Sequence, residues 1–159
     1  MTEQDLIPIV IAAATFHQLD PALICAMCCH ESSWNPDAVR YEPAFFTRYI
    51  KPMVNPVTGL IKGYPSSLEA QLRSTSIGLM QIMGQTAREQ GFAGDLELLK
   101  LPENGVAEGC VKFARCLKVK GNNHDALLMY NGGGAPEYPD LVLQFYDKYK
   151  QLLGLGSAT

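Results

Sequence analysis

The chain has 159 residues, 47% of them hydrophobic, and a formal net charge of −3 at pH 7. This length is enough to bury one sizeable core, and a weakly negative chain without a basic stripe is not typical of a nucleic-acid-binding protein. The apolar stretches are too short and interrupted to predict a transmembrane segment. Because no linker or internal repeat divides the sequence, we expect a single domain over residues 1–159.

The first predicted helix covers residues 5–17. Its apolar stripe consists of Ile7, Val10, Ile11 and Ala14, a pattern typical of a helix that packs on a core. The residues before it include Glu3 and Asp5 and lack the basic segment of a secretory signal. We therefore expect a chain without an ordinary signal peptide.

A second helix is predicted to begin at Pro21, with Asp20 as its N-cap, and to end before Asn35-Pro36. Glu31 falls in the last turn of this helix. Both the negative end of the helix dipole and burial beside apolar neighbours are expected to raise the pKa of Glu31. Cleavage of a glycosidic bond requires such a protonated acid, because the leaving oxygen takes up a proton. The alternative is a solvated glutamate at a helix end.

The segment between Pro36 and Ser76 is an enlarged connection, and its prolines and glycines argue against one long helix. Its aromatic side chains either form the wall or lid of a cleft or pack as a structural excursion; they are Phe45, Phe46, Tyr49 and Tyr64. Glu42 lies near its start. If Glu42 faced Glu31 across a cleft, a second carboxylate would be available for hydrolysis by water.

Further helical segments follow this connection. Helices are predicted at residues 86–90, 102–120 and 136–153, with a brief turn from residue 95. Another helix contains Tyr130 and is predicted to be capped by Asn123 or Asp125. The longest carries an apolar stripe formed by Val106, Cys110, Phe113, Ala114 and Leu117. Residues 154–159 are predicted to form a frayed tail.

The cysteine count of five is odd, so at least one thiol is unpaired within the chain. Cys25 and Cys28 have a metal-like spacing, but no second ligand pair follows, and His17, His30 and His124 are scattered. We therefore expect no metal site and expect the cysteines to pack as small hydrophobic residues. A reduced set favours synthesis in the cytoplasm without export by a disulfide-forming pathway.

Three segments in order carry a family resemblance. They read Glu-Ser-x-x-Asn-Pro over residues 31–36, Ser-Thr-Ser-Ile-Gly-Leu-Met-Gln-Ile-Met-Gly-Gln-Thr over residues 74–86, and Ala-Leu-Leu-Met-Tyr-Asn-Gly-Gly-Gly over residues 126–134. Together they resemble the signature segments of the soluble lytic transglycosylase catalytic domain of the lysozyme superfamily, over roughly residues 6–153. The resemblance implies a mainly α, lysozyme-like domain with a long irregular or small β insertion between the catalytic helix and the Gly-Leu-Met-Gln segment.

The resemblance also implies roles for single residues. Glu31 takes the position of the catalytic acid, and residues 78–83 take the position that lines the sugar cleft. Within that segment Met80 would lie against a sugar ring, and Gln81 would hydrogen-bond its hydroxyl or acetamido groups. Ser76 would either cap a following helix or direct its hydroxyl toward the catalytic carboxyl. A core methionine and a surface glutamine are the structural alternatives.

Tyr130 and Asn131 match the cleft-facing Tyr-Asn pair of the family. The ring of Tyr130 would stack on the substrate, and its hydroxyl would bond either the substrate or Glu31. Asn131 and the glycines after it also mark the end of a helix, where left-handed backbone conformations are tolerated. Both readings of Asn131 are compatible.

The function implied is that of a peptidoglycan lytic transglycosylase. Glu31 would protonate the β-1,4 bond between N-acetylmuramic acid and N-acetylglucosamine and then, as base, help the muramoyl C6 hydroxyl to close on C1. The product is a 1,6-anhydromuramoyl end, and no cofactor or metal is required. One alternative is a goose-type-lysozyme-like muramidase that uses water and Glu42. Another is a catalytically inactive peptidoglycan-binding or scaffold protein.

The implied partner is the glycan strand of peptidoglycan. We expect the protein to be a monomer that acts at the bacterial cell wall, in the periplasm. Without a signal peptide, the chain would suit a phage lysis protein, a virion-associated enzyme, or a component of a secretion or conjugation apparatus.

Overall fold

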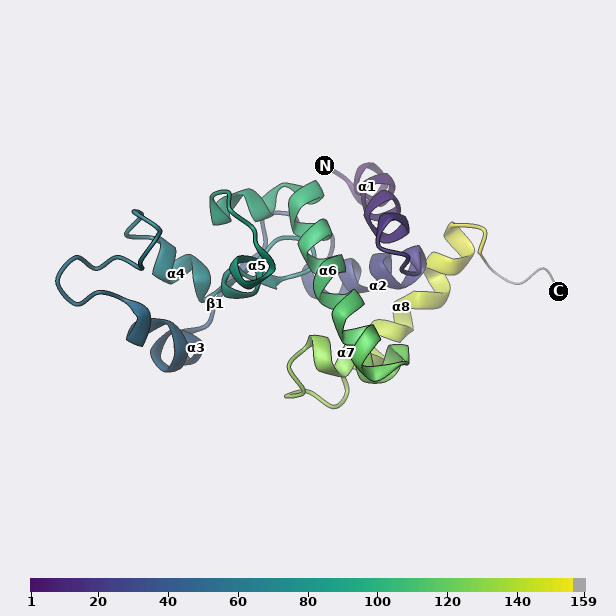
Figure 1. Cartoon of the computed structure of the whole chain (residues 1–159). Helices are drawn as coiled ribbons and strands as arrows, with labels where there is room; N and C mark the ends of the chain where they lie inside the picture. Colours follow the sequence, from purple (N-terminus) through teal and green to yellow (C-terminus); the bar gives the residue numbers. More distant parts are fainter. Residues whose placement is uncertain (156–159) are drawn as a thin grey trace.

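The computed structural model describes residues 1–155 and is mainly helical, with a small antiparallel sheet (Figure 1). Its α-helices are α1 (Glu3–Phe16), α2 (Pro21–Ser32), α3 (Pro43–Phe45), α4 (Glu69–Arg73), α5 (Gly84–Gln90), α6 (Pro102–Lys120), α7 (Asn123–Tyr130) and α8 (Tyr138–Leu152). Three further helical turns are η1 (Phe46–Ile50), η2 (Lys51–Met53) and η3 (Leu96–Lys100). The predicted fold class is confirmed. Part of the predicted frayed tail, residues 156–159, lies outside the described residues.

Side-chain caps set the starts of the first two helices. At α1, Thr2 accepts a hydrogen bond from the Asp5 N–H, and the Asp5 carboxylate accepts one from the Thr2 N–H at 2.7 Å. This capping box starts the helix two residues before the predicted position at residue 5. At α2, Asp20 accepts from the Ala22 N–H at 2.9 Å, and Pro21 occupies the first helical position, as predicted.

The start of α7 differs from the prediction. Its N-cap is Asn122, whose side chain accepts from the Asp125 N–H at 2.9 Å, rather than Asn123 or Asp125. Asn122 has the extended backbone of an N-cap, with φ −146° and ψ 157°, whereas Asn123 is already helical. Neighbouring residues of the same type cannot be told apart by cap preference alone.

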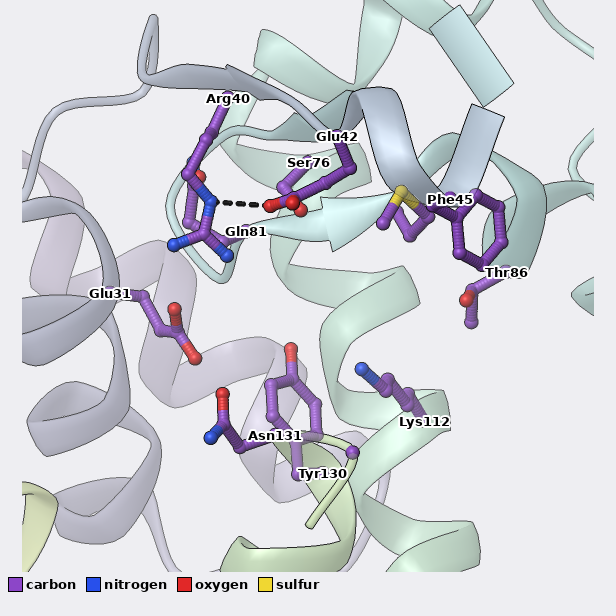
Figure 2. A pocket seen from close by; sticks show the side chains of 12 residues that line it. Glu31, Arg40, Glu42, Phe45, Ser76, Gln81, Thr86, Lys112, Tyr130 and Asn131 are labelled. Carbon is purple, nitrogen blue, oxygen red and sulfur yellow. Dashed lines mark ion pairs between the residues drawn. The ribbon is translucent and has the colours of Figure 1, made fainter. Parts of the chain in front are cut away.

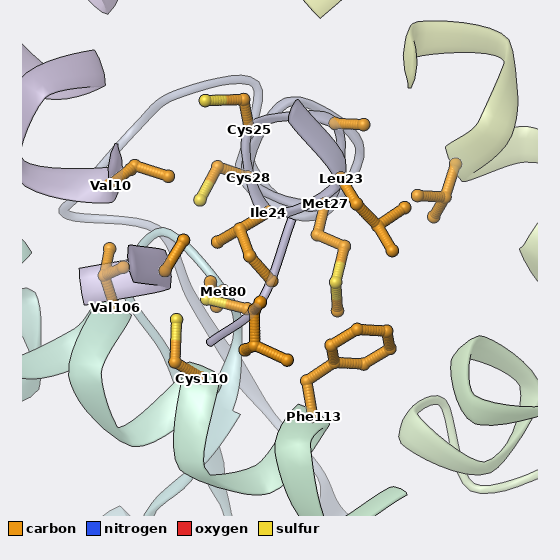
Figure 3. Packing of buried hydrophobic residues seen from close by; sticks show 14 of the residues in the cluster. Val10, Leu23, Ile24, Cys25, Met27, Cys28, Met80, Val106, Cys110 and Phe113 are labelled. Carbon is orange, nitrogen blue, oxygen red and sulfur yellow. The ribbon is translucent and has the colours of Figure 1, made fainter. Parts of the chain in front are cut away.

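The main core surrounds α2, which packs against α1 and α8 and faces α6 (Figure 3). Every residue of α2 from Ala22 to Cys28 is buried. All five cysteines are free thiols, and burial raises the pKa of Cys25 and of Cys110 to about 12. Four of them are buried as small hydrophobic side chains, as predicted, while Cys29 is only partly buried.

The sheet has the order β1-β2-β3 and is formed by β1 (Val39–Tyr41), β2 (Thr75–Ile77) and β3 (Ile82–Met83). Its register pairs Arg40 with Ser76, and Ser76 with Met83. The sheet therefore brings the segment after α2 beside the Gly-Leu-Met-Gln segment. No helix among the described residues is both long and apolar enough to cross a membrane.

Residues 43–73, called the insertion below, project from the sheet away from the main core (Figure 1). The insertion has a small core of its own, in which Phe45, Phe46 and Val54 pack on Ile50, Ile61 and Ala70. It is thus a folded unit of short helical turns, consistent with the expectation that no single long helix forms there.

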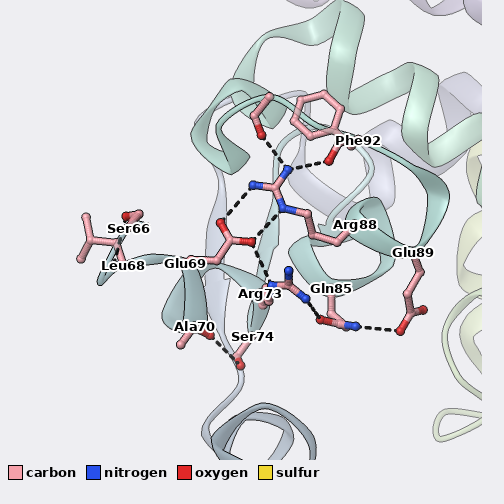
Figure 4. Close-up of polar contacts among 11 residues, drawn as sticks. Ser66, Leu68, Glu69, Ala70, Arg73, Ser74, Gln85, Arg88, Glu89 and Phe92 are labelled. Carbon is pink, nitrogen blue, oxygen red and sulfur yellow. Dashed lines mark hydrogen bonds and ion pairs between the residues drawn. The ribbon is translucent and has the colours of Figure 1, made fainter. Parts of the chain in front are cut away.

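A buried carboxylate joins the insertion to α5 (Figure 4). Glu69 accepts hydrogen bonds from Arg73 Nε at 2.9 Å and from Arg88 Nε at 2.8 Å and Nη2 at 3.0 Å. The ring of Tyr64 covers both guanidinium groups, at 4.7 Å from Arg73 and 4.1 Å from Arg88. Tyr64 is therefore part of this anchor and does not supply the cleft wall that its sequence position allowed.

The substitution Glu69→Gln is expected to lower the free energy of unfolding by about 3 kcal/mol, because two buried guanidinium groups lose their counter-charge. Urea unfolding measures this difference. The matched control is Glu97→Gln, since Glu97 is exposed and faces Lys100 at 3.9 Å, and it should leave the unfolding midpoint unchanged. Equal effects in the two variants would contradict the assigned anchor.

The same anchor predicts a pH dependence of stability. Burial raises the pKa of Glu69, but hydrogen bonds and charge from Arg88 and Arg73 outweigh it, and the pKa lies below its ordinary value. The stabilisation is therefore complete above the ordinary glutamate pKa and is lost as the pH falls through the lower folded-state pKa. Urea midpoints across acidic pH should converge for the native chain and Glu69→Gln; parallel curves would contradict this.

Candidate active site

Glu31 borders a hollow of about 390 Å³ (Figure 2). This volume lies within the range usual for small-molecule sites, about 300–1,000 Å³. The sequence-predicted residues that line it are Glu31, Glu42, Phe45, Ser76, Gln81, Tyr130 and Asn131. The fold thus brings together side chains from the end of α2, the sheet and the end of α7.

Glu31 lies in the last turn of α2, as predicted, and is partly buried. The Tyr138 hydroxyl donates a hydrogen bond to Glu31 Oε1 at 2.6 Å. Burial raises the pKa of Glu31, whereas the Tyr138 hydrogen bond and the positive charges of Lys112 and Arg40 lower it. Burial prevails, so Glu31 holds its proton to a higher pH than an ordinary glutamate.

Tyr138 is a partner of Glu31 that sequence reasoning missed. It is the first residue of α8, and the His30 ring packs edge-on against it, with centroids 5.1 Å apart. Burial and the nearby Glu31 raise the pKa of its phenol, so the hydroxyl remains a donor. Tyr138 and Glu31 are 107 positions apart, and no spacing rule links a tyrosine at the start of one helix to a carboxylate at the end of another.

Tyr130 has a different partner from those predicted. Its hydroxyl donates to the Met80 carbonyl at 2.7 Å, and its ring is buried against Phe113. The hydroxyl therefore ties the end of α7 to the Gly-Leu-Met-Gln segment. The ring still borders the hollow, where Lys112 Nζ lies 4.0 Å from its centroid.

Met80 lies in the core and not on the wall of the hollow. Its side chain is fully buried, and a Cβ at Gly109 of α6 would lie only 2.4 Å from its sulfur. Met83 lines the hollow instead. Side chains alternate along β3, so Met83 faces the hollow while Ile82 packs in a core with Ile77 and Leu96.

Gln81 has a left-handed backbone, with φ 45°, which is uncommon for a residue other than glycine. Its amide nitrogen donates to the carbonyls of Ala38 at 3.1 Å and Gly78 at 3.0 Å. These bonds use the amide nitrogen, and the amide oxygen can still accept a hydrogen bond. A constrained backbone of this kind is often found at functional sites.

Ser76 does not cap a helix, because it lies inside β2 and the next segment is a turn that leads into β3. It is buried and lines the hollow. Asn131 is exposed at the end of α7 with φ −75°, and the left-handed conformations fall on Gly132 and Gly133 instead.

Glu42 also lines the hollow, where Arg40 Nε lies 2.6 Å from its Oε1 (Figure 2). Lys112, on α6, is a second cation in this hollow that the sequence did not indicate. Burial lowers the pKa of Lys112 and outweighs nearby Cys116 and Glu31, which raise it, so the pKa lies below its ordinary value. Lys112 precedes Phe113 of the apolar stripe on α6, and the sequence does not distinguish it from an ordinary surface lysine of that helix.

Residues 8–139 match the family model described as Transglycosylase SLT domain. A search of curated proteins gave no match, and neither did a search of solved structures.

The hydrogen bond between Tyr138 and Glu31 can be tested without any assay of function. The substitution Tyr138→Phe removes a donor that favours the ionised carboxylate, so the pKa of Glu31 should rise further. Carbon NMR of labelled glutamate carboxyl groups across pH measures it. Tyr146→Phe is the control, because Tyr146 donates to Asp20 at the opposite end of α2, and it should leave the Glu31 titration unchanged. A lowered pKa in Tyr138→Phe would refute the assignment.

Proposed function

Because the chain belongs to the transglycosylase SLT domain family, whose activity is the lytic-transglycosylase-type degradation of peptidoglycan, we propose that Glu31 carries the reaction as general acid and then base. The bond cleaved is the β-1,4 bond between N-acetylmuramic acid and N-acetylglucosamine. The observation that carries the proposal is Glu31 itself, a carboxyl of raised pKa that borders the hollow and accepts a hydrogen bond at 2.6 Å.

In the first step Glu31 transfers its proton to the glycosidic oxygen, and the C1–O bond breaks. The carboxylate left behind keeps the hydrogen bond from Tyr138 and lies within the field of Lys112 and Arg40, which all favour its charged form. Tyr138 is thus a positioning residue that balances the two protonation states of Glu31. A general acid is most effective when both states are within reach near the working pH.

In the second step the Glu31 carboxylate accepts the proton of the muramoyl C6 hydroxyl, whose oxygen bonds to C1. This closes the 1,6-anhydro ring, restores the protonated acid and consumes no water. The acetamido group of the substrate supplies the assistance at C1 that a protein nucleophile gives in two-carboxylate enzymes. Gln81, with its free amide oxygen, and Ser76 and Asn131 would bind polar groups of the sugars.

Glu42 supports a second candidate, a muramidase that uses water. Its carboxylate lines the same hollow as Glu31, as the two-carboxylate mechanism requires. Arg40 Nε, however, lies 2.6 Å from Glu42 Oε1, so this carboxylate is already engaged in an ion pair and is not free to activate water. We therefore favour transglycosylation, performed by a monomer on the glycan strands of the cell wall in the periplasm. A phage particle or a secretion or conjugation apparatus would be its setting.

The substitution Glu31→Gln tests the proposal directly. The amide keeps the shape of the side chain but has no transferable proton, so release of soluble muropeptides from purified peptidoglycan should fall at least about 100-fold. Binding to the insoluble wall, measured by sedimentation, should persist. Undiminished release would overturn the role of Glu31, and binding without release by the native chain would favour a scaffold function.

Glu42→Gln separates the two candidate mechanisms. If Glu31 acts alone, the variant should release 1,6-anhydromuramoyl products at a rate within about threefold of the native chain, since no transfer passes through Glu42. Mass spectrometry of the products measures both rate and identity. A loss as deep as that of Glu31→Gln would instead assign Glu42 as the second carboxylate of a hydrolase.

A further inference from the structure

A second hollow, of about 370 Å³, lies where the insertion meets α5. Phe45, Tyr49 and Met53 line it from the insertion, and Thr86 and Glu89 line it from α5. Phe45 and Thr86 also line the hollow of Glu31, so the two hollows are neighbours. We call this second one the insertion hollow.

The two walls of the insertion hollow differ in chemistry. Tyr49 and Met53 leave apolar surface in water, with exposed fractions of 50% and 46%. The Phe45 and Tyr49 rings pack at 5.0 Å between centroids, and the Arg48 guanidinium lies 5.1 Å from the Tyr49 ring. Exposed aromatic surface beside polar groups marks a binding surface rather than a core.

The opposite wall carries polar groups that a sugar can use. Thr86 offers a hydroxyl, and Glu89 an exposed carboxylate whose Oε1 accepts from Gln85 Nε2 at 2.8 Å. The second oxygen of Glu89 is available to accept hydrogen bonds from hydroxyl groups. A pyranose ring presents apolar C–H faces and a polar rim of hydroxyl groups, which matches one aromatic wall and one acceptor wall.

The two walls are held together by a chain of hydrogen bonds (Figure 4). Arg73, on the insertion, donates to Gln85 Oε1 at 3.0 Å, and Gln85 in turn donates to Glu89. Arg73 is itself fixed by the buried Glu69. The walls of the insertion hollow are thus connected through a buried ion pair, and such preorganisation lowers the entropic cost of binding.

We propose that the insertion hollow is a distal subsite that binds a further sugar of the same glycan strand whose bond Glu31 cleaves. The inference rests on the proposed function, because it takes the occupant from the polymer that the catalytic hollow would hold. A glycan strand continues beyond the cleaved bond, and the neighbouring hollow lies next to the one that would hold that bond. The neutral N-acetylglucosamine units of the strand suit the Glu89 wall better than a stem peptide, which carries carboxylates of its own.

The test uses glycan strands graded in length from tetrasaccharide to octasaccharide, prepared both without and with stem peptides, and measures kcat/KM for each. The native chain should cleave long strands more efficiently than short ones. In Tyr49→Ala the ratio of long-strand to short-strand kcat/KM should fall by about threefold to tenfold, from the loss of one aromatic contact. Tyr49→Phe should keep most of the ratio, because it retains the ring.

The matched control is Phe16→Ala, which removes an 81% exposed aromatic ring on α1, remote from both hollows. Its ratio should equal that of the native chain. An unchanged ratio in Tyr49→Ala overturns the distal subsite, as does an effect seen only on strands that carry stem peptides. Failure of the native chain to cleave strands of any length would instead overturn the proposed function, so the two failures are distinguishable.

Discussion

At the end of α2, burial and hydrogen bonding act on Glu31 in opposite directions, and the chemistry of the site depends on their balance. Burial raises the pKa of the carboxyl, whereas Tyr138, Lys112 and Arg40 lower it. This balance exists because α2 is packed among the other helices and α8 begins at Tyr138. The helical core therefore does more than stabilise the fold, since burial within it raises the pKa of Glu31.

A second carboxylate, the buried Glu69, fixes the insertion against α5. Its hydrogen bonds to Arg73 and Arg88 join the insertion to α5, and α5 borders both hollows. The insertion consists of short turns, and its buried core contains only Ile50, Ile61 and Ala70 among the described residues. A core of this size supplies little hydrophobic stabilisation. The polar anchor thus links its stability to the shape of the proposed glycan cleft.

Local signals predicted much of this fold. Asp20 with Pro21 gave the start of α2, and Pro102 with Gly121 bounded α6 at its observed limits. The resemblance brought Glu31, Gln81 and Asn131 to one hollow, as the structure has them. What the sequence did not reveal depended on contacts distant in sequence: the Tyr138 hydrogen bond, the burial of Met80 against Gly109 and the hydrogen bonds of Arg88 to Glu69. Such contacts leave no local pattern, because each residue is ordinary in its own segment.

The central claim is that Glu31 alone cleaves the strand and that the substrate, not water, closes on C1. Digestion of purified peptidoglycan by the native chain in water enriched in oxygen-18, followed by mass spectrometry of the new ends, tests it most directly. The account predicts 1,6-anhydromuramoyl ends that carry no heavy oxygen. Reducing muramoyl ends with one oxygen-18 atom, incorporated during the cleavage itself, would contradict it.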